Sequence, residues 1–262
     1  KGANQAKVAF EALNAAQLAA RASGATTEET LRGITAILNT YGDTGITAAQ
    51  ITDKLFATFD QGAATVPELT ASIGQVAGIA KSFGISIDEV FGTIAVLTRG
   101  GQTASEAITN LRQALISTAN GGAMEKVAGQ LKALGLSADL FSAQSLRQNG
   151  LIGVLGQVEK AGGKPILNKL YTDTQGFLAV STLLAKGLEQ TRDDIERVGQ
   201  SAGKTDQAVA TISQNFDQLA GIAKNKLGAA MIEIGDKIMP TVAKVLAQLG
   251  DYAEKNGTAI AD

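Results

Sequence analysis

The sequence predicts an all-α protein, on the basis of three observations. The 262 residues are 45% apolar but only 4% aromatic, so alanine and the aliphatic side chains must build most of the core. Only three prolines occur, which leaves long stretches free to form helices. Apolar residues also recur at intervals of three and four, for example at Leu31, Ile34, Ile37 and Leu38. These patterns are typical of helices that each bury one face.

The starts of the first helices are marked by capping boxes, in which a Ser or Thr side chain caps the N3 amide and a Glu or Gln three residues later reaches back. We expect a helix over residues 1–25, followed over 26–119 by an array of short antiparallel helical hairpins. Glycine, apolar residue and hydroxyl follow one another at 45–47, 84–86 and 135–137, as expected between helices. Five boxes fit, with starts 17 to 21 residues apart: Thr26/Glu29, Thr47/Gln50, Thr65/Glu68, Ser86/Glu89 and Thr103/Glu106.

The pattern after Gly121 is less regular, although it still predicts helices. Gly162, Gly163 and Pro165 indicate a break. The two helices after this break, one apolar and one charged, are expected to pair as a further hairpin. We therefore predict one compact helical domain over residues 26–203. Its later helices are expected around Met124–Leu134, Leu146–Val158, Phe177–Gly187 and Gln190–Gln200.

Residues 204–262 are predicted to form a separate, long amphipathic helix of coiled-coil type, kinked or split near Pro240. Its apolar stripe could pair with copies of itself, dock on a partner, pack on the preceding bundle, or lie on a membrane surface. The mixed signs of its charges argue against the membrane. The candidate interaction residues, spaced mostly three and four apart, are Leu227, Met231, Ile234, Ile238, Val242, Val245 and Leu249.

The composition argues against an enzyme. The absence of histidine and cysteine excludes Ser-His and Cys-His nucleophiles, disulfides and thiolate metal sites. Neighbouring carboxylates, such as Asp193 and Asp194, point about 100° apart on a helix and cannot share one substrate. The same holds for the pairs at 28–29 and 88–89. The glycine-rich segments at 99–101 and 120–122 lack the spacing of a phosphate-binding loop. We expect no catalytic residue, no cofactor and no metal.

Charge and hydropathy further restrict the partners. The net charge is -2 and the Lys and Arg residues are dispersed, so no specific nucleic-acid ligand is expected. No apolar run reaches the roughly 18 to 20 residues that cross a bilayer, and the first residues lack the apolar core of a signal peptide. We expect a soluble segment. Because it begins at Lys1, we also expect it to belong to a longer polypeptide.

The segment 97–107, LTRGGQTASEA, followed by LRQAL at 111–115, resembles the core of phage tail tape measure proteins of the siphophage and prophage type. The resemblance extends over roughly residues 20 to 250. It departs most after Gly163, where LYTDTQGF at 170–177 stands in place of the family's usual Phe-Gly element. Further segments agree in order: GATTEE at 24–29, NTYG at 39–42, FGISIDEV at 83–90, LKALGLS at 131–137, LG at 227–228 and IMP at 238–240.

The resemblance implies a structural role in the virion. Such proteins run through the lumen of the tail tube in a few, trimer-like copies. They set tail length during assembly, contact the tail tube and the tail-tip or baseplate hub proteins, and leave with the genome at ejection, when they can meet the host membrane. The competing interpretation is a soluble helical-repeat adaptor or a secreted helical effector, suggested by the helix rhythm of about 20 residues. That rhythm breaks after Gly121.

Overall fold

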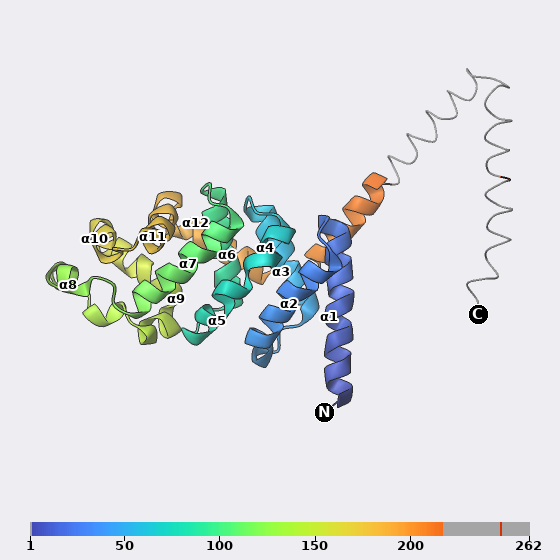
Figure 1. Cartoon of the computed structure of the whole chain (residues 1–262). Helices are drawn as coiled ribbons and strands as arrows, with labels where there is room; N and C mark the ends of the chain where they lie inside the picture. The colour runs from blue at the N-terminus through green and yellow to red at the C-terminus, as the bar shows by residue number, and fades with distance from the viewer. Residues whose placement is uncertain (1, 217–246, 248–262) are drawn as a thin grey trace, which may run out of the picture. The chain divides into compact units, whose positions relative to one another are not determined.

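The computed structural model describes residues 2–216 and residue 247, and this part of the chain contains helices and no strands, which confirms the all-α class (Figure 1). The chain divides into two compact units, Lys1–Ala210 and Thr211–Asp262. The second unit is described only at 211–216 and at 247, where it is helical. The description below therefore concerns the first unit.

Short helices follow one another through the first unit, with two single turns of 3-10 helix among them. A further helical segment begins at residue 204 and runs to 216. The elements before it are α1 (Gly2–Ser23), α2 (Thr27–Tyr41), η1 (Gly42–Thr44), α3 (Ala48–Gln61), α4 (Val66–Ser72), α5 (Gly74–Ser82), α6 (Ile87–Arg99), α7 (Ala104–Ala119), α8 (Met124–Ala133), η2 (Ala138–Leu140), α9 (Ala143–Lys160), α10 (Lys164–Leu170), α11 (Thr174–Lys186) and α12 (Leu188–Gly199).

Four of the five predicted capping boxes form completely, at the starts of α2, α3, α4 and α7. At α7, for example, the Glu106 amide donates to Thr103 Oγ1 at 3.3 Å, and the Thr103 amide donates to Glu106 Oε2 at 2.8 Å. The fifth box forms only in part. Ser86 caps α6 by accepting from the Glu89 amide at 3.1 Å, but the Glu89 side chain turns to another helix.

The glycines at 45, 84 and 135, which were predicted to lie between helices, all have positive φ. Gly84 has φ +73°, and the Ile85 amide donates back to the Ala80 carbonyl at 2.9 Å, which closes a Schellman turn. One boundary and one helix were not predicted. Ile73 separates α4 from α5 within what was expected to be one helix. The break at Gly162 and Gly163 was predicted, but α10, which begins directly after it, was not; Pro165 lies in its first turn, where a missing N–H costs nothing.

Helix α6 lies in the middle of the first unit, and nearly all its residues are buried (Figure 1). It packs against α3, α7, α11 and α12. Gly92 allows α12 to come close, because a Cβ atom at this position would lie 2.7 Å from Ile195 Cα. The residues of α6 that are buried are Ile87, Val90, Phe91, Gly92, Thr93, Ile94, Ala95, Val96, Leu97 and Thr98.

The expectation of successive hairpins needs correction. Several consecutive helices do touch, but the main contacts of α3 are with α1 and α6, those of α5 are with α7, and those of α4 are with α2. Likewise α11 and α12 meet only slightly, since α11 packs mainly on α7 and α12 on α6. The reason is that an apolar face specifies that a helix must be covered, but not which helix covers it.

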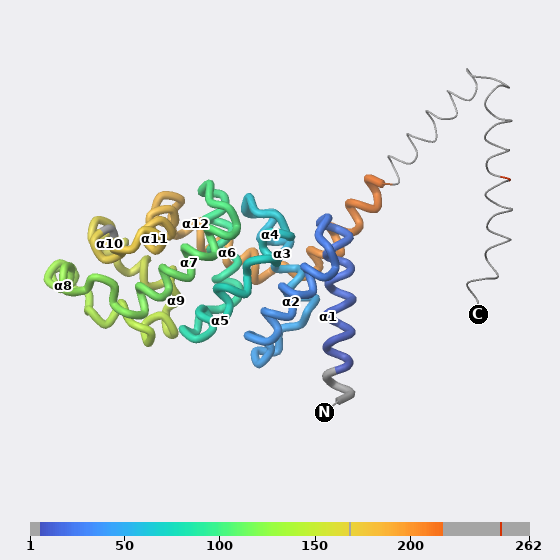
Figure 2. The backbone as a smooth tube through the Cα atoms, viewed as in Figure 1, coloured from blue at the N-terminus to red at the C-terminus, as the bar shows by residue number. Residues whose placement is uncertain are grey.

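The chain returns towards its start after α12. Residues 200–210, the first part of the orange segment after α12, lie beside α1 (Figure 2). There Ala208 and Val209 pack against a small apolar cluster that is separate from the main core. This cluster is contributed by α1, α3 and α4, and consists of Ala19, Ala22, Phe56 and Val66.

Candidate functional site

A buried carboxylate on α12 is the centre of a polar network that joins three helices. The face of α12 that packs on the core includes Leu188, Thr191, Asp194 and Val198. Asp194 is fully buried, whereas its neighbour Asp193 is exposed. Consecutive residues on a helix point about 100° apart, so only one of the two carboxylates can face the core. A buried carboxylate requires a cation or hydrogen-bond donors.

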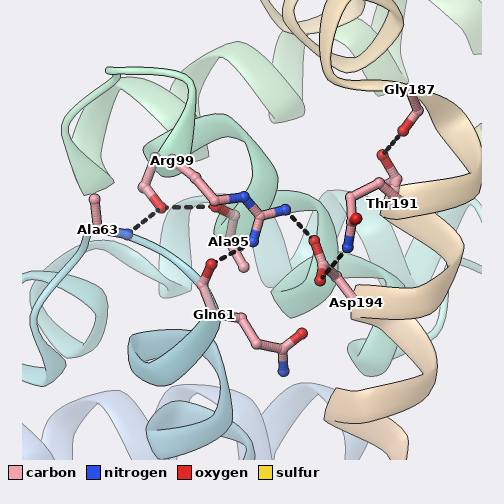
Figure 3. A network of polar contacts seen from close by, with 9 residues as sticks. Gln61, Ala63, Ala95, Arg99, Gly187, Thr191 and Asp194 are labelled. Carbon is pink, nitrogen blue, oxygen red and sulfur yellow. Dashed lines mark hydrogen bonds and ion pairs between the residues drawn. The ribbon is translucent and has the colours of Figure 1, made fainter.

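Arg99, the last residue of α6, supplies that cation (Figure 3). Its guanidinium pairs with Asp194 through one nitrogen and donates to the Gln61 carbonyl at the end of α3 through another. Gln190 Nε2 donates to the second Asp194 oxygen at 3.2 Å. The position of Arg99 also favours its charge, because the C-terminal end of a helix carries partial negative charge. The network therefore ties α3, α6 and α12 together.

A second ionic group lies about two turns before Gln61 on α3. Lys54 Nζ lies 2.7 Å from Asp88 Oδ1, at the start of α6, and donates to the Val198 carbonyl at 3.3 Å. The Lys54 side chain is only 11% exposed, so this lysine sits at the contact between helices rather than on an open face. It connects the same three helices as Arg99, near the opposite end of α6.

Glu89 of α6 caps a helix that lies 63 residues further along the chain. Its Oε1 atom accepts from the Ile152 amide at 3.0 Å. The acceptance is possible because α9 is interrupted at Gly150, which has φ 68° and ψ 173°, so a new helical start with free amides follows. A Cβ atom on Gly150 would lie 2.2 Å from Glu89 Oε2. The kink and the carboxylate therefore fit each other closely.

The burial of Glu89 predicts a distinct dependence of stability on pH. Burial raises the pKa of Glu89 above its ordinary value of 4.5, although the amides of Ile152 and Leu151 oppose the shift. A raised pKa in the folded state stabilises the fold below the ordinary pKa, and this contribution disappears as pH rises through the raised value. The free energy of unfolding of the wild type minus that of Glu89→Gln should therefore fall as pH increases above 4.5.

Urea unfolding at a series of pH values measures this difference. Glu106→Gln is the control with the opposite sign, because hydrogen bonds from the Thr103 amide and hydroxyl lower the pKa of Glu106. The free energy of unfolding of the wild type minus that of Glu106→Gln should rise as pH increases through the lowered pKa towards 4.5. A difference for Glu89 that stays constant or rises with pH would contradict the assigned shift.

The arrangement of these groups serves to join helices. Each carboxylate of the network is already paired with a cation of another helix or accepts from amides of one, which leaves it poorly placed to act on a substrate. No group of three metal-binding side chains occurs in the part of the chain that the structure describes. Within the same residues, no helix is long and apolar enough to cross a membrane.

The predicted interaction residues, from Leu227 to Leu249, lie outside the described residues, and their role stays a prediction. Sequence reasoning missed Lys54, Arg99 and Asp194. A charged residue at a core-facing position of an amphipathic helix was the available signal, since Asp194 falls in register with Leu188, Thr191 and Val198. The partners of these residues carried no such signal, because they lie far away in the chain, for example 95 residues between Arg99 and Asp194 and 144 between Lys54 and Val198.

The fold and this network define a class, namely a helical protein whose charged groups hold its own helices in place. The model of the phage-related minor tail protein family matches residues 2–175, more than half of the chain. The chain therefore belongs to the phage-related minor tail protein family. This membership indicates a structural role in the virion tail and interaction with other tail components. No curated protein and no solved structure matches the chain.

Proposed function

We propose that this chain is a segment of a tail tape measure protein, which sets tail length during assembly and leaves with the genome at ejection. The observation that carries the proposal is the family match over residues 2–175, together with the ordered segments that resemble tape measure proteins. The principal segment, 97–107, spans the end of α6, a turn with positive φ at Gly101, and the start of α7. It includes Arg99, whose ion pair with Asp194 links the central helix to α12.

Two measurements on phage particles test the proposal at different levels. Peptides from this chain should be found by mass spectrometry in purified tails, and their absence would contradict any role in the virion. Deleting 28 residues, four heptads, from the predicted long helix should shorten the tail by about 42 Å if that helix runs along the tube, at about 1.5 Å per residue. If tails that contain the shortened chain have normal length, the chain is a tail protein but does not set tail length, and the tape measure proposal is wrong.

The proposed location is the lumen of the tail tube or the tail tip. There the chain would assemble in a few, trimer-like copies and contact tube and tail-tip or baseplate hub proteins, with contact to the host membrane at ejection. The predicted apolar stripe supports association, because apolar residues spaced three and four apart form the seam of a coiled coil.

Replacing both Met231 and Ile234 with Asp should disrupt this association, since it places two charges in an apolar seam. Light scattering should show a smaller particle, and complementation of a tail-defective phage should fail. Asn225→Asp is the control for added negative charge, because it places one carboxylate at a position outside the stripe. Unchanged mass and normal tails with the double variant would show that the stripe is not an interface.

A further inference from the structure

The turn after α12 is built from a few backbone hydrogen bonds. The Ser201 amide donates to the Val198 carbonyl at 3.3 Å, and the Lys204 amide donates to the Ser201 carbonyl at 3.1 Å. Gly203 has φ +81°, which turns the chain into the helical segment that starts at residue 204. The first amides of this helix need an acceptor, because no earlier turn of the helix supplies one.

Asp53 of α3 is that acceptor, although it lies 150 residues earlier in the chain. Its two carboxylate oxygens accept from the Gly203 and Thr205 amides, both at 2.9 Å. A carboxylate at the N-terminal end of a helix is stabilised by the partial positive charge there. Thr205 Oγ1 adds a hydrogen bond to Thr52 Oγ1 at 3.0 Å, and Lys204 Nζ pairs with Asp60 at 2.7 Å.

Few apolar contacts accompany these polar bonds. Only Ala208 and Val209 of this segment pack against the small cluster around Phe56, and both are themselves partly exposed. α12 is held differently. It buries Leu188 and Val198 in the main core, and its backbone at Ile195 lies against Gly92. The manner of attachment therefore changes at the end of α12, from core packing to hydrogen bonds and ion pairs.

We propose that residues 200–210 form a clasp, held to α3 chiefly by Asp53, that opens as a unit while α1 to α12 stay folded. Water can replace the polar bonds of the clasp, each of which contributes little net free energy, and opening exposes little apolar surface. Segments of this kind open at a free energy below that of global unfolding. Opening releases the first turns of the helix that starts at residue 204, so that their amides can exchange with water. The proposal does not depend on the tape measure assignment.

Hydrogen exchange of the full chain at low urea concentrations tests the clasp, with α7 as the reference for global unfolding. Amides of residues 205–210 should exchange about tenfold or more faster than the slowest amides of α7, with little dependence on urea. Ile108→Val in the core of α7 destabilises the closed and the opened forms equally. It should speed exchange in α7 about three- to tenfold and leave residues 205–210 unchanged.

Two further variants test the role of Asp53. Asp53→Ala should speed exchange of residues 205–210 by about tenfold, the effect of losing a good N-terminal cap. Asp60→Ala is the control, because its exposed ion pair with Lys204 should matter less than about threefold. The proposal is wrong if Ile108→Val speeds α7 and residues 205–210 alike, or if Asp53→Ala leaves residues 205–210 as they are in the wild type.

Discussion

Replacing Arg99 with alanine should lower the free energy of unfolding by about 3 kcal/mol, because it leaves the fully buried carboxylate of Asp194 without a cation. Breaking a buried pair by removing one partner costs about 3 to 5 kcal/mol. We expect the lower end of this range, since the Arg99 side chain is 34% exposed and water can reach the site after truncation. The loss also includes the hydrogen bond to the Gln61 carbonyl, which ties α3 to α6. Urea unfolding followed by circular dichroism measures the change.

Two controls separate the buried pair from a general effect of charge. Arg112→Ala removes an exposed arginine from α7 and should change stability by less than about 0.5 kcal/mol. Asp193→Asn removes the exposed neighbour of Asp194 and should be similarly mild. In the Arg99→Ala background, Asp194→Asn should recover part of the stability, because no uncompensated charge is left. If the loss of stability in the double variant equals the sum of the losses in the two single variants, the pairing of Arg99 with Asp194 is contradicted.

Gly150→Ala is the second large effect, with an expected loss of about 3 kcal/mol. The backbone at Gly150, with φ 68° and ψ 173°, lies in a region essentially reserved for glycine, where strain costs about 1 to 3 kcal/mol. The new Cβ atom would also lie 2.2 Å from Glu89 Oε2 and must displace the carboxylate that caps the second half of α9. Unpairing such amides adds about 1 to 3 kcal/mol. Unfolding in urea gives the size of the loss.

Gly129→Ala is the matched control for this substitution. Gly129 lies within α8, and a Cβ atom there would meet nothing within 4 Å. Alanine in that position should be neutral or stabilise by about 0.5 to 1 kcal/mol, through its higher helix propensity. The double variant Gly150→Ala with Glu89→Gln should lose less free energy of unfolding than the two single variants together, since both changes disturb the contact between Glu89 and α9. If the two losses simply add, the Glu89 carboxylate is not involved in the effect of Gly150→Ala.

Local features of the fold were predictable because their causes lie within a few residues. A capping box needs only a hydroxyl and a Glu or Gln three residues later, so four helix starts formed as predicted. At α6 the same pattern was misleading. Ser86 caps as expected, but the Glu89 carboxylate binds the amide of Ile152 instead of completing the box. A distant helix start offered Glu89 a partner that local spacing cannot reveal.

The candidate site was less predictable than the helices. Asp53, Arg99 and Asp194 are ordinary charged residues when they are taken one at a time, and each becomes distinct only through a partner far away in the chain. Helix geometry predicted that Asp193 and Asp194 point in different directions, but it did not show that Asp194 is the one that is buried. Burial depends on which helix covers which face, and that is set by packing.

The sequence by itself determined the helical class, most helix starts and several helix ends, because caps, glycines with positive φ and apolar periodicity act over one or two turns. The tertiary structure alone decided that α6 is the central helix, that α12, far along the chain, is the main helix packed against it, and that Glu89 and Asp53 cap helices far along the chain. The physical reason is that hydrophobic burial is non-directional. Close approach at Gly92 and the demands of buried charges then select one arrangement among many.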